Sequence, residues 1–577
     1  MKNIAFFIFI LLTASAAAAF AVAQEFREIS VQDYRDKMKA GWIGQIAGVC
    51  WGGPTEFKFK GEIIPEDKMP KWTPEMINHA FGQDDLYVEM TFLRSLEQYG
   101  LNVTQRQAGI DFANSGYQLW HANDAGRKNL RQGIAPPDSG HPAFNKHADD
   151  IDYQIEADYS GLIAPGLPKV VVELGDKFGG LMNYGDGIYA GQFVGGMYAE
   201  AFFETDIKKI IAAGLDCIPQ DSQYAEMVRD VVKWHSENPN DWTTCWQKID
   251  DKYQKNKDYR RLACDSGKFN IDAKINGAYI LVGLLYGNGD LDKTIIISTR
   301  CGQDSDCNPS NAGGVLFTTL GFSKLPPRFS EKLDNEKKFS YTEYNFPALL
   351  DACEKITRQA VLQSGGKIVN RNGEEVFLIP VQKSSEQTVT VRRGIFGQPK
   401  IRILQTSPKP YKPAWQPEPP QNVKFNEDEF KQITKREYNL QETVEKFFPG
   451  WKLTDCGPDM EPGYREEYSG KRNVLMTHPK AKGEPCILSK IVELPKDKKA
   501  TLKLVVAAHE AAKAQFDWEL IVKANGKELL KKQIIGNWQD ISVDLSEFSG
   551  QTVKLELLNQ PNGWACEAGY WSKIVIE

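Results

Sequence analysis

The spacing of apolar residues divides the chain into a helical part and a strand-rich part. From about residue 29 to 360, apolar positions recur every three or four residues, as in helices that bury one face. The clearest such face runs over residues 85–98, and Gly100 behind it is a typical helix end. Further helices are predicted over 207–215, 223–235, 273–285 and 312–320.

Glycine is frequent inside these predicted helices. Small residues allow two helices to approach closely, so we expect a compact all-α domain with tightly crossed helices. The glycines in question are Gly41, Gly44, Gly48, Gly195, Gly196, Gly313 and Gly314.

After Gly366 the period changes to that of strands. Apolar runs flank Asn372-Gly373, which predicts a β-hairpin, and a cluster of prolines between Pro408 and Pro420 predicts a stiff linker. Residues 501–505 and 552–557 alternate, and Asn525-Gly526 is a second hairpin turn, so the C-terminal part is predicted to be an antiparallel β-sandwich. Its tryptophans either pack in the core or stack on sugar rings; they are Trp451, Trp518, Trp538, Trp564 and Trp571.

Length and charge restrict the class of protein. The 577 residues are too many for one ordinary core, so two or more domains are expected. A formal charge of -6 provides no polycation, so no nucleic-acid partner is expected. Lys2, an apolar run over 4–12 and Ala21-Val22-Ala23 predict a bacterial signal peptide, and hence a periplasmic or secreted protein without stable membrane insertion.

These patterns predict four segments: a signal peptide over 1–23, an all-α domain over 24–365, a β-hairpin extension with a Pro-rich linker over 366–425, and a candidate carbohydrate-binding sandwich over 426–577. The chain has ten cysteines and no C-x-x-C pair. Spacing leaves the pairing open: Cys245 with Cys264, two of Cys456, Cys486 and Cys566, or buried thiols.

Three acidic segments carry the candidate chemistry. They are Pro54-Thr55-Glu56, Asp84-Asp85 and Asp304-Ser305-Asp306, the last ahead of a small-residue run. Carboxylates at helix starts suit a hard divalent cation such as Mg²⁺ or Mn²⁺. A lone Asp-x-Asp is more often a loop or a helix cap. A calcium loop starting at Asp304 is excluded, because Pro309 and Val315 stand where it needs glycine and an acid.

The order of these segments resembles the ADP-ribosylglycohydrolase family, which includes dinitrogenase reductase-activating glycohydrolases, ADP-ribosyl-acceptor hydrolases and J1 crystallins. The resemblance covers about residues 35–325 and rests on three motifs. They are the glycine-rich run 41–56 that ends in Gly53-Pro54-Thr55-Glu56, then Gln83-Asp84-Asp85, then Gly302-Gln303-Asp304-Ser305-Asp306.

The resemblance implies an all-helical fold with a centre of two Mg²⁺ or Mn²⁺ ions that prepares a water for attack at an anomeric carbon. The implied metal ligands are Glu56, Gln83, Asp84, Asp85, Asp304 and Asp306. Glu56 and Asp85 are the implied catalytic residues, with Glu56 as ligand or general base.

Two departures from the family pattern affect the metal centre. Gln83 and Cys307 stand where the family has threonine. An amide oxygen of Gln83 replaces a hydroxyl ligand acceptably, whereas a thiol is a poor ligand for Mg²⁺, so we expect Cys307 outside the coordination shell. Occupancy of the second metal site, and the substrate, are therefore left open.

Polar runs in the middle of the helical part are candidates for substrate binding, since carboxylates and amides beside aromatic rings suit sugar hydroxyls. The candidates are Asp152, Asp158, Arg127, Asn183 and Asp186. The alternative for each run is a solvated loop, and for Arg127 it is pairing with neighbouring acids.

The sequence thus predicts an exported, metal-dependent glycoside hydrolase that cleaves an N- or O-glycosidic bond in a glycan or glycoside. The alternatives are an ADP-ribosyl-protein hydrolase, a non-catalytic glycan-binding or structural protein, and a glycan-binding module with a structural metal. The choice of glycan rests on the predicted export and the sandwich, which are associations.

Overall fold

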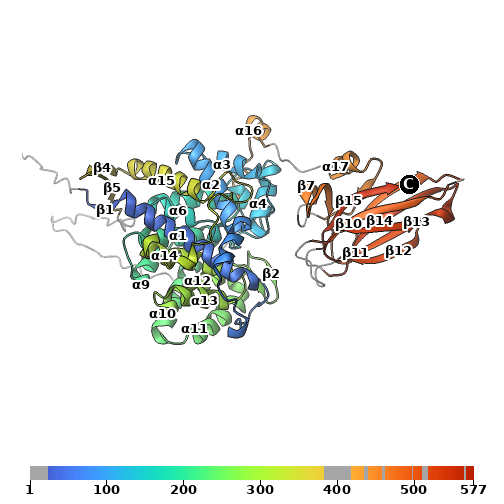
Figure 1. Cartoon of the computed structure of the whole chain (residues 1–577). Helices are drawn as coiled ribbons and strands as arrows, with labels where there is room; N and C mark the ends of the chain where they lie inside the picture. Colours follow the sequence, from blue (N-terminus) through green and yellow to red (C-terminus); the bar gives the residue numbers. More distant parts are fainter. Residues whose placement is uncertain are drawn as a thin grey trace, which may run out of the picture.

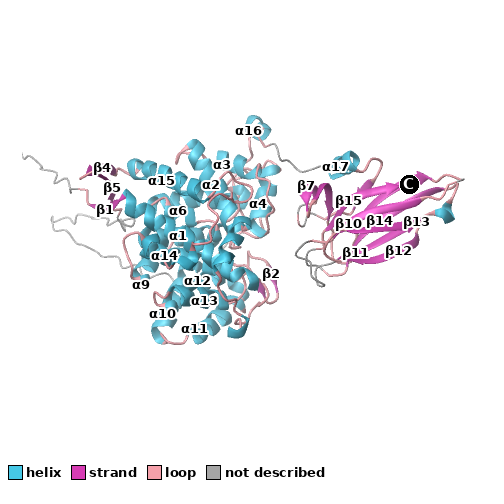
Figure 2. Cartoon of the chain, viewed as in Figure 1, coloured by secondary structure: helices cyan, strands magenta, loops and turns pink. Residues whose placement is uncertain are grey.

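The computed structural model describes residues 24–382, 417–433, 440–457, 460, 462–496, 498–509, 518–563 and 567–577. Helices dominate up to residue 363, and antiparallel strands dominate from residue 452 onward (Figures 1 and 2). The predicted fold class is therefore confirmed. The predicted signal peptide, the prolines from 408 to 413, Trp564 and Cys566 lie outside the described residues.

The helical part follows the predicted periodicity. Its α-helices are α1 (Val31–Gly52), α2 (Asp84–Tyr99), α3 (Gln105–Ala113), α4 (His121–Arg131), α5 (Asp152–Ile155), α6 (Asp158–Leu162), α7 (Pro168–Phe178), α8 (Asp186–Ala201), α9 (Ile207–Leu215), α10 (Gln223–Glu237), α11 (Trp242–Ile249), α12 (Ala273–Gly287), α13 (Leu291–Arg300), α14 (Cys307–Leu320) and α15 (Phe346–Gln363). In the described part of the chain, no helix combines the length and the hydropathy that a membrane crossing requires.

Helix α14 begins earlier than the predicted 312–320. Pro309 lies in its first turn, where the missing N–H of proline has no acceptor within the helix. The proline is therefore compatible with a helix that starts at Cys307.

Helices α1 and α14 cross with their main chains in contact. A Cβ atom added at Gly44 would lie 2.4 Å from the carbonyl oxygen of Gly313, and one added at Gly48 would lie 2.2 Å from that of Pro309. Both separations are shorter than any tolerable contact, so glycine is required at these positions. The close approach predicted from glycine spacing is the central packing feature of the helical part.

A small sheet closes one end of the helical part. Strands β4 (Lys367–Arg371) and β5 (Glu374–Pro380) form the predicted hairpin, and β1 (Phe26–Ser30), which the sequence did not predict, pairs with β5. The turn residues Asn372 and Gly373 both have positive φ, 56° and 92°, as a two-residue hairpin turn requires.

The segment 417–433, part of which was predicted as linker, packs on the helical part. Ala135 donates to the carbonyl of Val423, and Phe425 donates to that of Gly133. The short helix α16 (Glu427–Lys431) is attached through an ion pair between Arg106 and Glu429. The end of this segment is therefore anchored to the helical part.

The C-terminal part is a sandwich of two antiparallel five-stranded sheets, preceded by α17 (Leu440–Phe447). One sheet has the order β13 (Gln539–Asp544), β10 (Thr501–Ala507), β15 (Gly569–Ile576), β8 (Lys471–Thr477) and β7 (Gly463–Tyr468). The other has the order β12 (Lys527–Ile534), β11 (Trp518–Ala524), β14 (Thr552–Pro561), β9 (Cys486–Glu493) and β6 (Lys452–Thr454).

The tryptophans of the sandwich divide by position. Trp451, Trp518 and Trp571 are buried in its main core, where they pack as ordinary core residues. Trp538 is only half-buried and belongs to a second, smaller cluster with Tyr468 and Tyr570.

Candidate metal centre

The close crossing of α1 and α14 brings the acidic segment Pro54-Thr55-Glu56 next to the segment Asp304-Ser305-Asp306. A Cβ atom at Gly52 would lie 2.0 Å from the carbonyl oxygen of Ser305, so the end of α1 lies directly on the loop before α14. The hydroxyls of Thr55 and Ser305 are 2.8 Å apart and hydrogen-bonded. Glu56, next in the chain, is thereby held beside the loop that carries Asp304 and Asp306.

The loop before α14 has an unusual backbone. Gly302 and Gln303 both have positive φ, 82° and 57°. A Cβ atom at Gly302 would lie 2.7 Å from the carbonyl oxygens of Phe59 and Glu62, so only glycine fits there. The main chain of Gln303 exchanges hydrogen bonds with Phe57 and Phe59, which fixes the loop against the segment after Glu56.

Helix α2 supplies the second acidic segment. Gln83 is the half-buried residue before the helix, and Asp84 and Asp85 lie in its first turn. The N-terminal end of a helix carries partial positive charge, which favours carboxylates there. Asp85 is fully buried, so its side chain faces the protein interior.

The acids from all three segments meet. Ligand atoms of Glu56, Asp304 and Asp306 lie within 4.8 Å of one another, and so do those of Asp85, Asp306 and Cys307. Asp306 belongs to both groups. We call Glu56, Asp84, Asp85, Asp304 and Asp306 the acid cluster.

The pKa of every acid in the cluster is raised, by burial and, for all except Asp306 itself, by the charge of Asp306. Burial and the charge of Asp306 raise the pKa of Asp84 to about 6. The pKa of Asp85 and that of Asp304 are raised well above the ordinary value, by burial first and then by Asp306. Glu56 is exposed at the edge of the cluster, and its pKa is raised mainly by the charge of Asp306. Without a cation, burial and mutual repulsion therefore favour the protonated forms of these acids.

Three oxygens of the cluster have no hydrogen-bond donor among the described residues. They are Oδ1 of Asp85, Oδ1 of Asp304 and Oδ1 of Asp306, and all three are buried. Buried carboxylate oxygens normally have a partner. An oxygen-only set of this kind fits a hard divalent cation, so the residues present suit the metal that the sequence predicts.

Cys307 is adjacent to the cluster but chemically different from it. Its thiol donates to Oδ2 of Asp85 at 3.3 Å, and burial, with the charges of Asp304 and Asp306, raises its pKa well above the ordinary value. It therefore remains a protonated thiol that orients Asp85.

A protein-family model described as ADP-ribosylglycohydrolase matches residues 30–363, which is more than half of the chain. The chain belongs to the ADP-ribosylglycohydrolase family. Membership of this family suggests a hydrolase that acts on glycosyl bonds, and the acid cluster lies within the matched residues.

Similarity outside the family model is more distant. A solved structure described as an ADP-ribosylglycohydrolase-related protein complex has 13% sequence identity and a TM-score of 0.35, and the match covers 57% of this chain and 99% of that chain. A structure described as "CBM4 structure and function" has 10% identity and a TM-score of 0.17, over 23% of this chain and 98% of that chain. No curated protein matches significantly.

Two further buried carboxylates are electrostatically coupled to Asp85 of the acid cluster. Asp158, predicted as a substrate ligand, is buried and accepts hydrogen bonds from the hydroxyl of Tyr198 and from Nδ2 of Asn311 at 2.6 Å. Burial raises its pKa to about 7, and its charge raises that of Asp85. The charge of Asp158 therefore disfavours ionisation of Asp85.

Glu89 is the second of these carboxylates, and the sequence reasoning missed it. It accepts hydrogen bonds from Nε2 of Gln45 at 2.6 Å and from the main-chain N–H of Tyr159 at 2.9 Å. It follows Asp85 by four residues on the buried face of α2, and this spacing was the available signal.

Asp152 and Glu156, the second of which the sequence did not predict, are buried carboxylates that both accept hydrogen bonds from Asn123. Asp152 accepts from the main-chain N–H groups of Ala122 and Asn123, at 3.3 and 3.0 Å, and burial raises its pKa to about 8. Glu156 accepts from Asn123, and its pKa is raised by burial and by the charges of Asp152, Asp84 and Asp85. Glu156 is thus electrically coupled to the acid cluster.

Arg127 and Asn183, predicted as substrate contacts, lie in the interior of the domain. Arg127 is fully buried and donates to the carbonyl of Tyr117 at 2.7 Å. Asn183 is buried and donates to the carbonyls of Ala148 and Asp150. Both polar groups are used to hold loops in place inside the domain.

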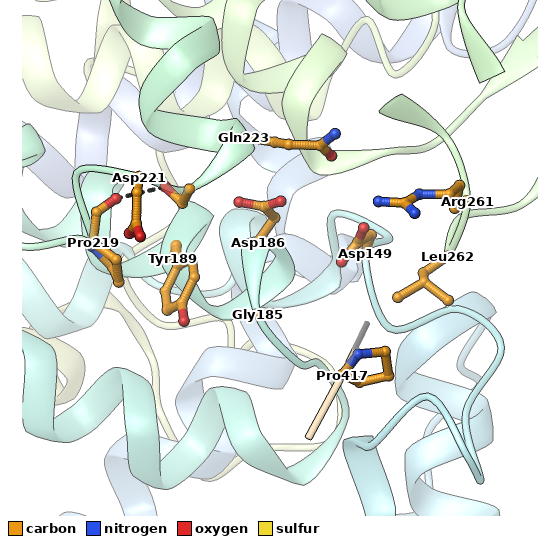
Figure 3. A pocket seen from close by; sticks show the side chains of 11 residues that line it. Asp149, Gly185, Asp186, Tyr189, Pro219, Asp221, Gln223, Arg261, Leu262 and Pro417 are labelled. Carbon is orange, nitrogen blue, oxygen red and sulfur yellow. Dashed lines mark hydrogen bonds between the residues drawn. The ribbon is translucent and has the colours of Figure 1, made fainter. Parts of the chain in front are cut away.

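Asp186 lies at a separate cavity of about 200 Å³ (Figure 3). The cavity is lined by Asp149, Asp186 and Arg261 among others, and no residue of the acid cluster lines it. Lys274 is buried 3.1 Å from Asp149 and 3.9 Å from Asp186, so these acids neutralise its charge. A structural ion network explains Asp186 without a substrate.

Proposed function

We propose that this protein is an exported metal-dependent glycoside hydrolase that cleaves an N- or O-glycosidic bond. The supporting observation is that acids from three distant segments form two groups that share Asp306, each with its ligand atoms within 4.8 Å of one another, and that buried oxygens of Asp85, Asp304 and Asp306 have no donor among the described residues. Buried carboxylate oxygens normally have a hydrogen-bond donor or a cation as partner. Export rests on the predicted signal peptide alone.

The proposed cofactor is Mg²⁺ or Mn²⁺, in two positions that share Asp306. Glu56, Asp304 and Asp306 would hold one ion, and Asp85 with Asp306 would hold the other, with Asp84 and Gln83 at its side. Bound ions of this kind lower the pKa of a coordinated water and orient sugar hydroxyls.

The residues of the cluster differ in what they can do. Glu56 is the most exposed acid of the cluster, and Asp306 raises its pKa, so it is suited to exchange a proton with water or a leaving group. Asp85 is fully buried and held by the thiol of Cys307, so it is suited to fix geometry. We therefore assign proton transfer to Glu56 and positioning to Asp85.

The proposed substrate is a glycan or glycoside outside the cytoplasm. The partly exposed Trp538, which meets the ring of Tyr468 edge to face, supports this choice, because it is an aromatic side chain of the sandwich core clusters that reaches the surface beside Tyr468. Sugar rings bind to such aromatic surfaces. An ADP-ribosylated protein is the second candidate, favoured by the family itself.

A non-catalytic protein on the same fold is the remaining alternative. It is favoured by Gln83 and Cys307, which depart from the family pattern, and opposed by the acids with unpartnered oxygens. Metal titration separates the alternatives, since a protein that neither gains stability from millimolar Mg²⁺ or Mn²⁺ nor turns over a glycoside would be non-catalytic.

The direct test is a screen of glycans, aryl glycosides and ADP-ribosylated proteins with Mg²⁺ or Mn²⁺. Asp304→Asn keeps the shape of the side chain but removes its charge, so it should abolish turnover. Asp67→Asn, at an exposed acid outside the cluster, is the matched control. Equal rates for Asp304→Asn and wild type would refute the metal mechanism.

A further inference from the structure

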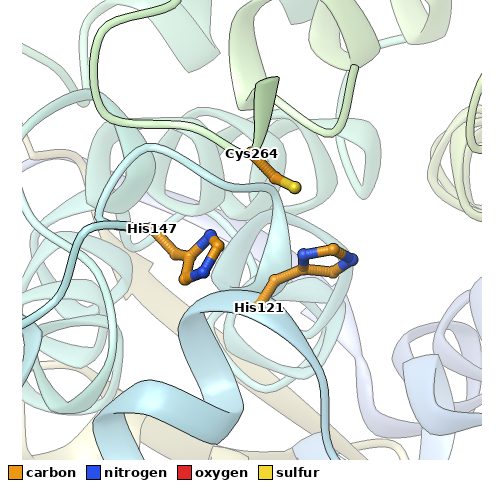
Figure 4. A group of neighbouring side chains, drawn as sticks. All are labelled: His121, His147 and Cys264. Carbon is orange, nitrogen blue, oxygen red and sulfur yellow. The ribbon is translucent and has the colours of Figure 1, made fainter. Parts of the chain in front are cut away.

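A second group of metal-binding side chains lies outside the acid cluster. His121, His147 and Cys264 place one ligand atom each within 4.8 Å of one another. Figure 4 shows the three side chains together, with the sulfur of Cys264 directed to the side of His121. The rings of His121 and His147 meet edge to face with centroids 5.7 Å apart.

One buried carboxylate, that of Asp150, is hydrogen-bonded to His147 and Cys264 and lies near His121. Oδ2 of Asp150 is 2.8 Å from Nδ1 of His147 and 3.7 Å from Nδ1 of His121, and Oδ1 accepts from the main-chain N–H of Cys264 at 2.8 Å. A metal-binding histidine nearly always donates its other ring N–H to such a carboxylate, which fixes the tautomer and the ring orientation.

The backbone at His121 is also held in an uncommon conformation. Its φ is 48°, which is the left-handed region that non-glycine residues rarely adopt. The next two N–H groups, of Ala122 and Asn123, are bonded to Asp152, so the start of α4 maintains this conformation. The result is that His121 faces His147 and Cys264, and strain of this kind is typical of ligand sites.

We propose that His121, His147 and Cys264 bind a Zn²⁺ ion. Two imidazoles and a thiolate suit this borderline-soft ion, whereas the acid cluster offers only oxygen and suits a hard one. The thiolate and the Asp150 carboxylate together balance the charge of Zn²⁺. All three ligand residues are partly exposed, so the ion has access from solvent, and a fourth position remains for water.

The zinc would join three separate segments: the start of α4, the loop at His147, and the loop before β2 (Asp265–Ser266). The ring of Phe269 stacks on His121 at 5.7 Å and meets Phe57, the neighbour of Glu56, at 5.1 Å. By fixing His121, the ion would therefore also hold Phe269 and Phe57, which lie next to Glu56 at the exposed edge of the acid cluster.

The test uses the full chain, stripped with a chelator and then titrated with Zn²⁺ or Co²⁺ in saturating Mg²⁺, so that the acid cluster is occupied. We expect one tightly bound Zn²⁺ per chain by mass spectrometry, and a thiolate-to-cobalt absorption band with Co²⁺. Cys264→Ser should lose the band. Cys456→Ser, at another partly exposed thiol, should keep it. Asp150→Asn should weaken Zn²⁺ binding roughly 10–100-fold.

Two results would overturn the proposal: a cobalt–thiolate band that survives in Cys264→Ser, or a wild type that retains no more Zn²⁺ than this variant. His147→Gln provides a second loss-of-ligand variant, and circular dichroism of each metal-free variant confirms folding. Asp304→Asn should keep its Zn²⁺, so this test stands apart from that of the proposed hydrolase activity.

Discussion

The charge of Asp306 should make the metal-free protein less stable. The charge of Asp306 contributes to the raised pKa of Glu56, Asp84, Asp85 and Asp304; for Asp84, burial first and then Asp306 raise the pKa from the ordinary 3.8 to about 6. A change of this size corresponds to about 3 kcal/mol at a pH where the acid is ionised. Because burial, the larger cause, remains when the charge of Asp306 is removed, Asp306→Asn should raise the free energy of unfolding in EDTA by only a part of this, roughly 1 kcal/mol for Asp84 near pH 8.

The sign of the pH dependence follows from proton binding. The folded, metal-free protein holds more protons on these acids than the unfolded chain does, since their folded-state pKa values are higher. The stabilisation is complete below about pH 4 and is lost as the pH rises through about 6 and above. Wild type in EDTA should thus lose stability between about pH 5 and about pH 8, and Asp306→Asn should lose less.

The assay is urea unfolding of wild type, Asp306→Asn and the control Asp67→Asn, each in EDTA at the two pH values. Asp306→Asn should also lose hydrolase activity, so this one substitution would increase the stability of the metal-free protein and abolish its function. If metal-free Asp306→Asn is no more stable than wild type near pH 8, and wild type keeps its stability across this range, the electrostatic reasoning is wrong.

Further predictions test the metal, the packing and the sandwich. Mg²⁺ or Mn²⁺ at about 100 times the dissociation constant measured near pH 8 should raise the free energy of unfolding of wild type by about 2.7 kcal/mol. The same ion concentration should stabilise the protein less near pH 5, because protons compete for the carboxylate ligands. Calorimetry near pH 5 and near pH 8 measures both effects, and a stabilisation that grows in acid would contradict the prediction. Gly48→Ala places a Cβ 2.2 Å from the carbonyl of Pro309, so it should cost roughly 1–3 kcal/mol and reduce turnover, whereas Gly53→Ala, with nothing within 4 Å, should keep its activity. Trp538→Ala should weaken binding to polymeric glycans and leave rates on small glycosides unchanged, and loss of both would place the sandwich at the active site. Arg127→Gln should lower the melting temperature and leave the KM of the folded enzyme unchanged, and a raised KM alone would restore its predicted role in substrate binding.

The sequence predicted those features that depend on local pattern. The acids at the start of α2 and before α14, and the glycines where α1 crosses α14, are readable because each motif has one short-range physical cause. The hairpins at Asn372 and Asn525 were readable for the same reason.

Features that depend on the orientation of a side chain in the assembled fold were not readable. Arg127 and Asn183 lie in polar runs that suit a binding loop, but their side chains turn inward to satisfy buried carbonyls. Glu156 and Glu89 gain their importance from charges far away in sequence. The cysteine pairing also depended on the fold: Cys264 faces two histidines, and Cys456 lies beside Cys486 as a thiol.

The anchored segment 417–433 limits the reach of the sandwich. Ile433 is buried with the helical part, and α17 begins at Leu440 and contributes Val444 to the sandwich core. Seven residue steps span at most about 25 Å, however they are arranged. A polysaccharide held by the sandwich would therefore stay within a short radius of the hydrolase, and its local concentration would be set by that tether.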